Sequence, residues 1–236
     1  ALDEDDINVK AGLVYRLKDD VEEISNIRLG YTGRFVDDSF KATEYNLTVE
    51  HASDFPSLDG FLLDDYYNRD NLSSGWFKIQ KNVDKYTVTK NIHSAYAEAT
   101  YQFTSRWIVN LGLKYDYVDI NVDYNVNRGG SEGSNTIRKD YFLPSLNLKY
   151  NLNEKHSLRL GASKTYTLPQ AKEISPYRYV GVNFNSQGNP NLKPSDNYNF
   201  DLKWDFNPSP TELVSLTAFY KHIKDPISRI EVASAG

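Results

Sequence analysis

Apolar and polar residues alternate along most of the chain, most clearly over residues 198–220. From 198 to 206 the even positions are apolar or aromatic, and the odd positions are Asn, Asp or Lys. This period of two is typical of a strand with one apolar face and one wet face. Residues 207–210 interrupt the pattern, because proline cannot donate to a ladder and favours a turn. The alternation resumes over 214–220, which predicts a hairpin with a tight connection.

The same alternation predicts further strands along the rest of the chain. They are expected at 7–17, 27–35, 45–49, 86–103, 107–124, 146–152 and 158–162. The run Asp37-Asp38-Ser39 is expected to end the second of these. After Val118 the apolar positions move from odd to even numbers, which indicates either a β-bulge or the exit of the strand from one environment. No segment shows the periodicity of an amphipathic helix of convincing length.

The predicted connections differ in length in a regular way. Long loops are expected at 51–85, 127–136 and 167–196, and short joins at 104–106, 153–156 and 207–211. From residue 86 onward long and short joins alternate, so all the long loops lie at one end of the sheet. This polarity is typical of bacterial outer-membrane barrels, whereas the crossovers of a soluble sandwich would usually mix the lengths.

Alternation alone does not say whether the apolar face meets a protein core or lipid. Trp107 and Tyr115 flank an aliphatic stretch centred on Leu111, as aromatic residues flank the apolar band of a membrane barrel. If this face meets lipid, Leu111 lies near the middle of the membrane and Asn110 faces the lumen. A lipid-facing barrel is therefore the first interpretation, and a soluble β-sandwich that binds glycans is the alternative.

Composition excludes several other classes of protein. With 39% apolar residues the chain can bury a core, and its net charge of −5 argues against a nucleic-acid partner. The absence of cysteine excludes a disulfide scaffold and any cysteine-based metal site. No apolar run approaches the ~18 to 20 residues of a membrane helix, but barrel strands need only alternating apolarity.

No set of residues has the spacing of a catalytic or metal centre. The four histidines are scattered, and no two of them have a metal-ligand spacing. Nucleotide-binding, calcium-binding and hydrolase motifs are missing as well. We therefore expect no enzyme activity, no resident metal and no cofactor.

Two aromatic and charged stretches in the predicted long loops are candidate ligand contacts. Such mixtures stack on sugars or clasp metal chelates, although a solvated loop whose aromatic rings pack on one another is the plainer explanation. The candidate residues are Asp64, Asp65, Tyr66, Tyr67, Arg69 and Trp76 in the first stretch, and Tyr177, Arg178 and Tyr179 in the second.

Several phrases in the second half of the chain resemble one family. They are Gly188-Asn189-Pro190-Asn191-Leu192-Lys193-Pro194, Phe219-Tyr220-Lys221 before Asp225-Pro226-Ile227, Tyr96-Ala97-Glu98, Leu111-Gly112-Leu113-Lys114-Tyr115-Asp116, and residues 160–169. In this order they are similar to the distal barrel of TonB-dependent outer-membrane receptors. The resemblance covers roughly residues 86–230.

The resemblance implies an all-β fold, an antiparallel up-and-down meander that is part of a large outer-membrane β-barrel. Residues 1–236 would be one partial barrel domain that lacks the N-terminal plug and the final strands, because large plugged barrels have ~22 strands. The implied function is uptake of a scarce ligand, a siderophore, an oligosaccharide or similar. The implied partners are outer-membrane lipid and, through the absent plug, TonB. The first residue is Ala1, and no secretion signal precedes the first strand, so a processed or excised piece is expected.

Overall fold

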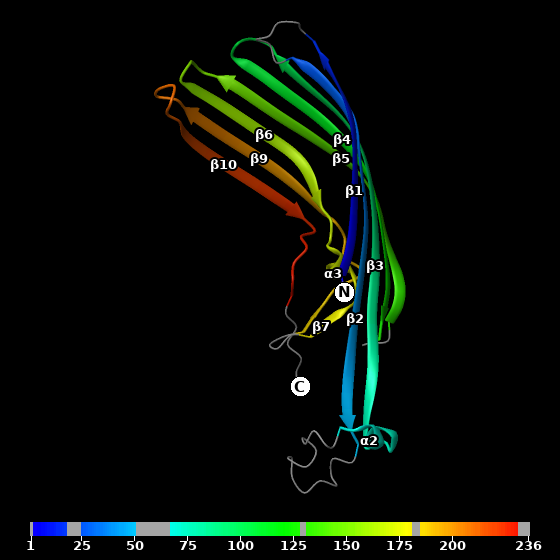
Figure 1. Cartoon of the computed structure of the whole chain (residues 1–236). Coiled ribbons are helices and arrows are strands. Elements are labelled where there is room, and N and C mark those ends of the chain that lie inside the picture. Colours follow the sequence, from blue (N-terminus) through cyan, green and yellow to red (C-terminus); the bar gives the residue numbers. More distant parts are fainter. Residues whose placement is uncertain (1, 18–24, 51–66, 128–130, 181–184, 231–236) are drawn as a thin grey trace.

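Eight strands form one antiparallel sheet in a computed structural model that describes residues 2–17, 25–50, 67–127, 131–180 and 185–230. The strands are β1 (Leu2–Arg16), β2 (Asn26–Val49), β3 (Phe77–Gln102), β4 (Trp107–Val126), β5 (Ser131–Asn151), β6 (His156–Thr167), β9 (Ser195–Phe206) and β10 (Val214–Lys224). Neighbours in the sheet follow one another along the chain, and the sheet curves into a trough (Figure 1). The predicted antiparallel meander is therefore confirmed.

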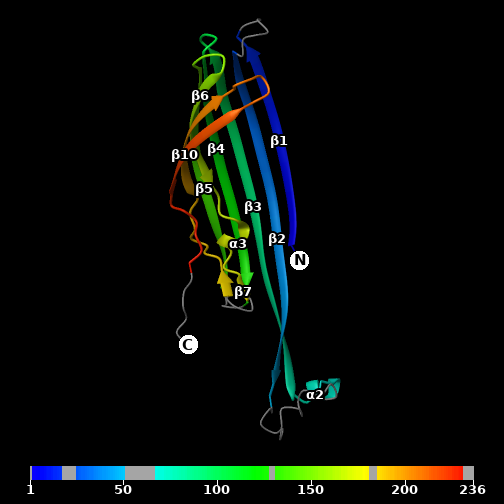
Figure 2. The same cartoon turned by 90° about the vertical axis from the view of Figure 1, so that its left-hand side faces the viewer.

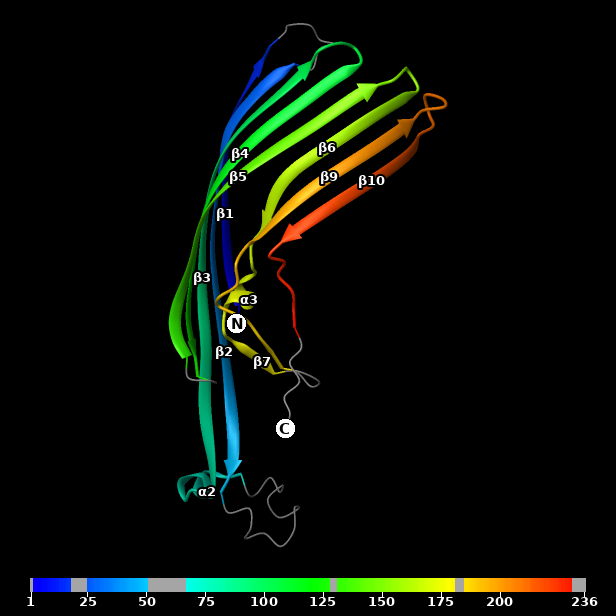
Figure 3. The ribbon, with the colours of Figure 1, turned by 180° about the vertical axis from the view of Figure 1, so that it is seen from behind.

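Short side chains close the tight turns at one end of the trough. Thr104 Oγ1 accepts hydrogen bonds from the backbone amides of Arg106 and Trp107, 3.2 and 3.3 Å away. Asn153 Oδ1 accepts from the amides of Lys155 and His156, both at 2.9 Å. These side chains replace backbone partners that the reversing chain lacks. The three short joins predicted after residue 86 all lie at this end (Figure 3).

Helical structure in the described residues is limited to two short helices. They are α2 (Arg69–Ser73) and α3 (Ala171–Ile174), and a separate two-stranded sheet consists of β7 (Arg178–Val180) and β8 (Asn185–Gln187). In the part of the chain that the structure describes, no helix is long and apolar enough to span a membrane. The expectation that long amphipathic helices are missing is confirmed for these residues.

Three predicted loop boundaries are wrong. Residues 37–39 do not end a strand, because β2 continues through them and pairs with β3 as far as Val49 opposite Phe77. Residues 77–85 and 131–136 were expected in loops, yet they form the outer parts of β3 and β5. Local sequence in these places favours turns, but backbone pairing with the neighbouring strand overrides this preference. The remainder of the first loop, residues 51–66, lies outside the described part.

Strands β2 and β3 extend well beyond β4. The pairing of β3 with β4 ends at Lys85 opposite Asn125, whereas the pairing of β2 with β3 continues to Val49 opposite Phe77. Residues 42–49 and 77–84 form this outer part of the β2–β3 hairpin, called the ribbon below, and α2 lies beside its tip (Figure 2).

The apolar side of β4 changes halfway along the strand. Pairing with β3 runs without a break from Asn125 to Ile108, so no bulge is present. Leu111 and Leu113 are 56% and 50% exposed on one face, whereas Val118 and Ile120 are fully buried on the other. The shift of the apolar pattern therefore marks the passage of the strand from one environment to another, as the second of the two sequence interpretations proposed.

A compact core lies on the concave face at the long-loop end. Its buried residues are Tyr86, Val88, Val118, Ile120, Val122, Tyr141, Leu143 and Ile174. Complete burial of a side chain such as Ile120 stabilises the fold by roughly 1.5 to 3 kcal/mol. Because Ile174 belongs to α3, the core joins the segment between β6 and β9 to the wall formed by β3, β4 and β5.

The two edges of the sheet generate a first prediction. Within the described residues β1 and β10 each pair with a single neighbour, and open strand edges pair readily with other chains. We expect the isolated 236-residue chain to form oligomers in buffer without detergent, as measured by light scattering. A monodisperse monomer would contradict this expectation and would revive the soluble sandwich.

Candidate functional site

The convex face of the sheet is apolar on all eight strands. On β4 and β5 the outward residues include Leu111, Leu113, Phe142 and Leu146, and each lies opposite another apolar residue of the neighbouring strand. The same holds for Leu160, Leu202 and Ala218 on the last three strands. A continuous exposed apolar surface of this extent is the mark of a surface that meets a partner or a membrane.

Aromatic residues border this apolar band at both levels. Trp107 stacks on Tyr150 near the short turns, with ring centroids 4.1 Å apart. Tyr115 packs on Phe142 at the opposite level, with centroids 5.2 Å apart. Two outward tyrosines of β4, Tyr115 and the 36% exposed Tyr117, lie at this level. They follow Trp107 by eight and ten residues, which gives about 26 to 33 Å along the strand and about 20 to 25 Å of height for a tilt of about 40°. The lipid-facing band of barrels is about 25 Å high.

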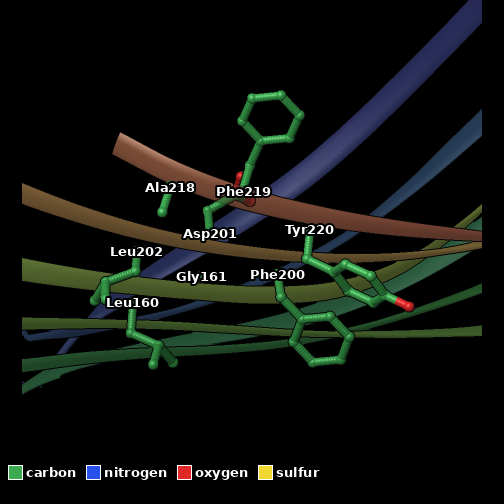
Figure 4. A pocket seen from close by; sticks show the side chains of 8 residues that line it. All are labelled: Leu160, Gly161, Phe200, Asp201, Leu202, Ala218, Phe219 and Tyr220. Atoms are coloured by element: carbon green, nitrogen blue, oxygen red, sulfur yellow. The ribbon is translucent and has the colours of Figure 1, made fainter. Parts of the chain in front are cut away.

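A shallow pocket on the convex face belongs to this band. It is lined by Leu160, Gly161, Phe200, Asp201, Leu202, Ala218, Phe219 and Tyr220 of β6, β9 and β10. Figure 4 shows that Phe200, Leu202 and Tyr220 point to one side of the sheet, whereas Phe219 points to the other. The hollow is a gap between rows of apolar side chains, so it fits an acyl chain better than a polar ligand.

The polar residues of the alternating pattern point to the concave face. Asn110 Nδ2 donates to Glu98 Oε1 at 2.6 Å and to Thr100 Oγ1 at 2.9 Å. Asn147 Nδ2 in turn donates to Asn110 Oδ1 at 3.3 Å. The predicted inward direction of Asn110 is therefore confirmed, and the side chain belongs to a hydrogen-bonded layer that crosses three strands.

A row of cations crosses the same face near the short turns. Lys149, Arg159 and Lys203 lie directly opposite one another on β5, β6 and β9. Asp205 is almost fully buried and pairs with Lys203 at 3.0 Å and with Arg159 at 3.5 Å. Ser215 Oγ donates to the same carboxylate. Asp205 pairs with two of the three cations, and one carboxylate against three cations leaves the row with a net positive charge.

Ion pairing and burial set the charge states at the long-loop end. Arg34 donates to Asp6 at 2.7 Å, and this hydrogen bond lowers the pKa of the carboxyl and keeps it ionised. Burial raises the pKa of Tyr86, and the charge of Asp38 adds to the effect. Tyr86 therefore stays a neutral phenol, and it stacks on Phe40 with ring centroids 4.9 Å apart.

The first stretch of candidate ligand contacts lies at the tip of the ribbon, as far as the structure describes it. Tyr67 packs edge-on against Phe77, with centroids 5.4 Å apart. Arg69 is exposed at the start of α2, and Trp76 is half-buried just before β3. The remaining members, Asp64, Asp65 and Tyr66, lie outside the described residues.

The second stretch lies away from the ribbon tip, beside the wall formed by the longer strands (Figure 1). Tyr177 is half-buried and packs edge-on against Phe40, with centroids 5.0 Å apart, while Arg178 and Tyr179 are part of β7. Nine residues of β2 separate Phe40 from Val49 at the ribbon tip, which corresponds to about 30 Å. The structure therefore does not bring Tyr177 together with the described residues of the first stretch.

Sequence reasoning missed the polar concave wall as a functional surface. The signal was present in the alternation, because every outward apolar residue implies inward neighbours. Which inward residues meet across strands depends on register, and the cation row of Lys149, Arg159 and Lys203 becomes visible only once the strands are paired.

Comparison with known proteins identifies relatives among receptors. A family model described as TonB dependent receptor-like, beta-barrel, matches residues 2–236. An iron-regulated outer membrane virulence protein of Vibrio cholerae is 32% identical over 91 residues, which cover 38% of this chain and 14% of that protein. A probable TonB-dependent siderophore receptor, PirA of Acinetobacter baumannii, is 28% identical over 170 residues, covering 67% of this chain and 20% of that protein.

Two crystal structures share the fold. The ferric yersiniabactin uptake receptor FyuA of Yersinia pestis superimposes with a TM-score of 0.59 at 13% identity, over 95% of this chain and 29% of that one. The siderophore receptor PiuA of Acinetobacter baumannii gives 0.54 at 16% identity, over 92% and 32%. The chain thus spans about a third or less of the length of each of these four proteins.

These findings settle the class of protein and its location. The family comprises receptors, which are not enzymes, and its barrels lie in the outer membrane. A single curved sheet with an exposed apolar convex face agrees with this, and a two-sheet sandwich does not. The chain therefore belongs to the β-barrel family of TonB-dependent outer-membrane receptors.

Proposed function

We propose that this chain supplies part of the barrel wall of a receptor that imports a ferric siderophore-type complex across the outer membrane. The observation that carries the proposal is the division of one sheet into an apolar convex face and a polar, net-positive concave face. The convex face meets lipid, and the concave face lines the ligand's route. A positive wall attracts anionic ligands, and many iron chelates carry negative charge.

The relatives support the choice of ligand class. The solved neighbours are named for ferric yersiniabactin uptake and for a siderophore, and a curated relative is named as a probable siderophore receptor. An oligosaccharide was the other ligand considered from the sequence. The net-positive concave wall favours the anionic iron complex over a neutral sugar.

The proposed partners lie outside this chain. The sheet has two edge strands in its described part and matches a minority of each relative, so we propose that further strands close the barrel. A plug domain would fill the lumen and receive energy from TonB. Residues 1–236 are then one section of a larger barrel domain.

Ligand capture is assigned to the ribbon tip and the neighbouring loops. Arg69 and Trp76 are the described residues proposed to contact the ligand, together with Tyr67, because α2 and the ribbon tip lie beyond the end of β4 and β5 (Figure 2). Asp64, Asp65 and Tyr66 belong to the same proposed site by sequence, whereas Tyr177, Arg178 and Tyr179 of the second stretch are proposed as separate ligand contacts.

Uptake of labelled iron tests the proposed function. In a strain that lacks the intact receptor, uptake of ⁵⁵Fe supplied in the culture supernatant of the iron-starved parent strain should fall at least about tenfold. The intact receptor should restore it only when TonB is present. Normal ⁵⁵Fe uptake combined with a lost ability to grow on an oligosaccharide would contradict the siderophore assignment.

A pair of substitutions tests the capture site. Arg69→Ala in the intact receptor should raise the half-saturating concentration of the same ⁵⁵Fe-containing supernatant at least about fivefold, because truncation of a central arginine contact typically costs more than 1 kcal/mol. Lys81→Ala removes an exposed cation from the shaft of the ribbon and serves as the control. Equal effects of the two substitutions would show that Arg69 acts only through general charge.

Orientation in the membrane is tested at one position of β4. Leu111→Arg in the intact receptor folded into bilayers should cost ~2 to 4 kcal/mol, because an arginine at the midplane of the lipid face is poorly solvated. Asn110→Arg should cost distinctly less where the lumen is wet. Both costs are measured as changes in the free energy of unfolding in lipid vesicles.

A third substitution at this position separates lipid from a protein core. Leu111→Phe should be nearly neutral, since lipid accommodates a larger ring. A close-packed protein interior would instead lose ~1 to 3 kcal/mol through overpacking. A loss of that size would show that Leu111 is covered by protein and would remove the basis for the proposed orientation.

A further inference from the structure

The segment between β6 and β9 folds back over the concave face of the sheet. Figures 1 and 3 show α3 and β7 inside the trough, next to the long-loop ends of β4 and β5. Residues 168–177 and 188–194 of this segment are here called the shelf. The shelf begins and ends at one point of the wall, because Thr167 and Ser195 are direct partners in the β6–β9 ladder.

The geometry of the sheet directs the shelf inward. Pairing of β5 with β6 ends at Ser145 opposite Ser163, whereas pairing of β5 with β4 continues. The residue next to this end is Pro144, which has no amide proton to donate to a ladder. Beyond this point β6 leaves β5 and turns toward the lumen (Figure 3), so the wall itself determines where the shelf starts.

Apolar contacts attach the shelf to the wall. Ile174 of α3 is fully buried in the core formed by β3, β4 and β5. Leu168, Ala171 and Leu192 pack against the same core. These contacts are the reason that the apolar residues of β4 change to the concave side after Val118, since the shelf covers them there.

A buried ionic contact holds the base of the shelf. Asp116 is 1% exposed and accepts a hydrogen bond from Tyr166 Oη at 2.8 Å. Lys114 Nζ neutralises the same carboxylate at 2.9 Å. The ring of Tyr166 stacks on Tyr141, with centroids 3.9 Å apart. Lys114 lies on the same strand as Asp116, so movement of Tyr166 would leave that ion pair in place but would remove a hydrogen bond to a buried carboxylate, and this loss opposes the movement.

Residues 188–190 connect the two halves of the shelf, residues 168–177 and residues 188–194. The Asn189 amide donates to the Glu173 carbonyl at 2.6 Å, and Asn135 of β5 donates to the Pro190 carbonyl. A Cβ atom at Gly188 would collide with the carbonyl oxygens of α3, so only glycine fits against the end of this helix. Both halves are therefore clamped to each other and to the wall.

We propose that the shelf is a fixed part of the barrel wall that narrows the mouth at the long-loop end and stays attached to β3, β4 and β5 while ligand passes. It acts as a specificity determinant, because it confines the ligand to the part of the lumen that it leaves open. The passage of ligand rests on the proposed function, whereas the attachment of the shelf rests on the contacts above.

Hydrogen exchange of the intact receptor tests the attachment without any substitution. Two short helices form a matched pair, because α3 buries Ile174 whereas α2 buries no residue. The helical amides of Ile174 and Ser175 should exchange at least about 100-fold more slowly than those of Leu72 and Ser74 in α2. Equal rates in the two helices would overturn the proposal, and this result does not depend on which ligand is transported.

A tether tests whether the shelf moves during transport. Asn135→Cys and Asn191→Cys place one thiol on β5 and one on the shelf next to Pro190, and this chain contains no other cysteine. After coupling with short bis-methanethiosulfonate reagents, which join the two thiols through disulfides that a reductant can cleave, uptake of ⁵⁵Fe from the iron-starved supernatant should stay within about twofold of that of the uncoupled receptor. The two single-cysteine variants, treated in the same way, control for modification alone.

The outcomes of these experiments separate the two proposals. Loss of uptake on coupling, reversed by a reductant, would show that the shelf must move and would overturn the fixed shelf. Failure of the uncoupled receptor to take up ⁵⁵Fe would count against the proposed function and would leave the exchange experiment as the test of the shelf.

A substitution of Gly188 tests directly whether its close packing against α3 keeps this helix in place. Gly188→Ala should raise the exchange rates of the α3 amides at least about tenfold, because the added methyl group forces α3 away from the core on which it packs. Gly161→Ala on the same concave face is the control, since a Cβ there meets Asn147 and Asp201 only at ordinary contact distances. Unchanged exchange rates of the α3 amides in Gly188→Ala would show that the packing of Gly188 does not keep the shelf in place.

Discussion

Hydrogen bonding between neighbouring strand backbones is the constraint on which the rest of this structure depends. In lipid no water satisfies an exposed amide or carbonyl, so each strand must pair along its whole membrane-crossing length. The ladders from β1 to β5 meet this requirement with a register that never slips. A fixed register in turn assigns every side chain to one face, and the two faces acquire separate tasks.

The division of tasks is not constant along a strand. At the level of Leu111 the outward side of β4 is apolar because lipid lies there, and the inward side is polar. At the level of Ile120 the inward side is apolar because α3 covers it, and the outward side carries Asp119, paired with Arg138. The apolar residues of β4 therefore change from the outward to the inward face along the strand, and the hydrogen-bonded ladder stays regular through this change.

Much of the fold was predictable because alternation shows directly which residues of a strand share a face. The strands, the short turns and the grouping of the long loops at one end of the sheet followed from it. The side-chain chemistry of Asn153 placed this residue in a turn. The boundaries were wrong where polar residues such as Asp37 lie in strands supported from both sides. Contacts between distant segments, such as Asp116 with Tyr166 or Asn135 with Pro190, depend on register and loop closure, which one strand's own sequence does not contain.

The ribbon has a consequence for how such a receptor diversifies. Residues 77–84 share no contacts of strand pairing with β4, because the pairing of β3 with β4 ends at Lys85. Insertions, deletions or exchange of residues at the ribbon tip change the length of this hairpin but leave the ladder between β3 and β4 intact.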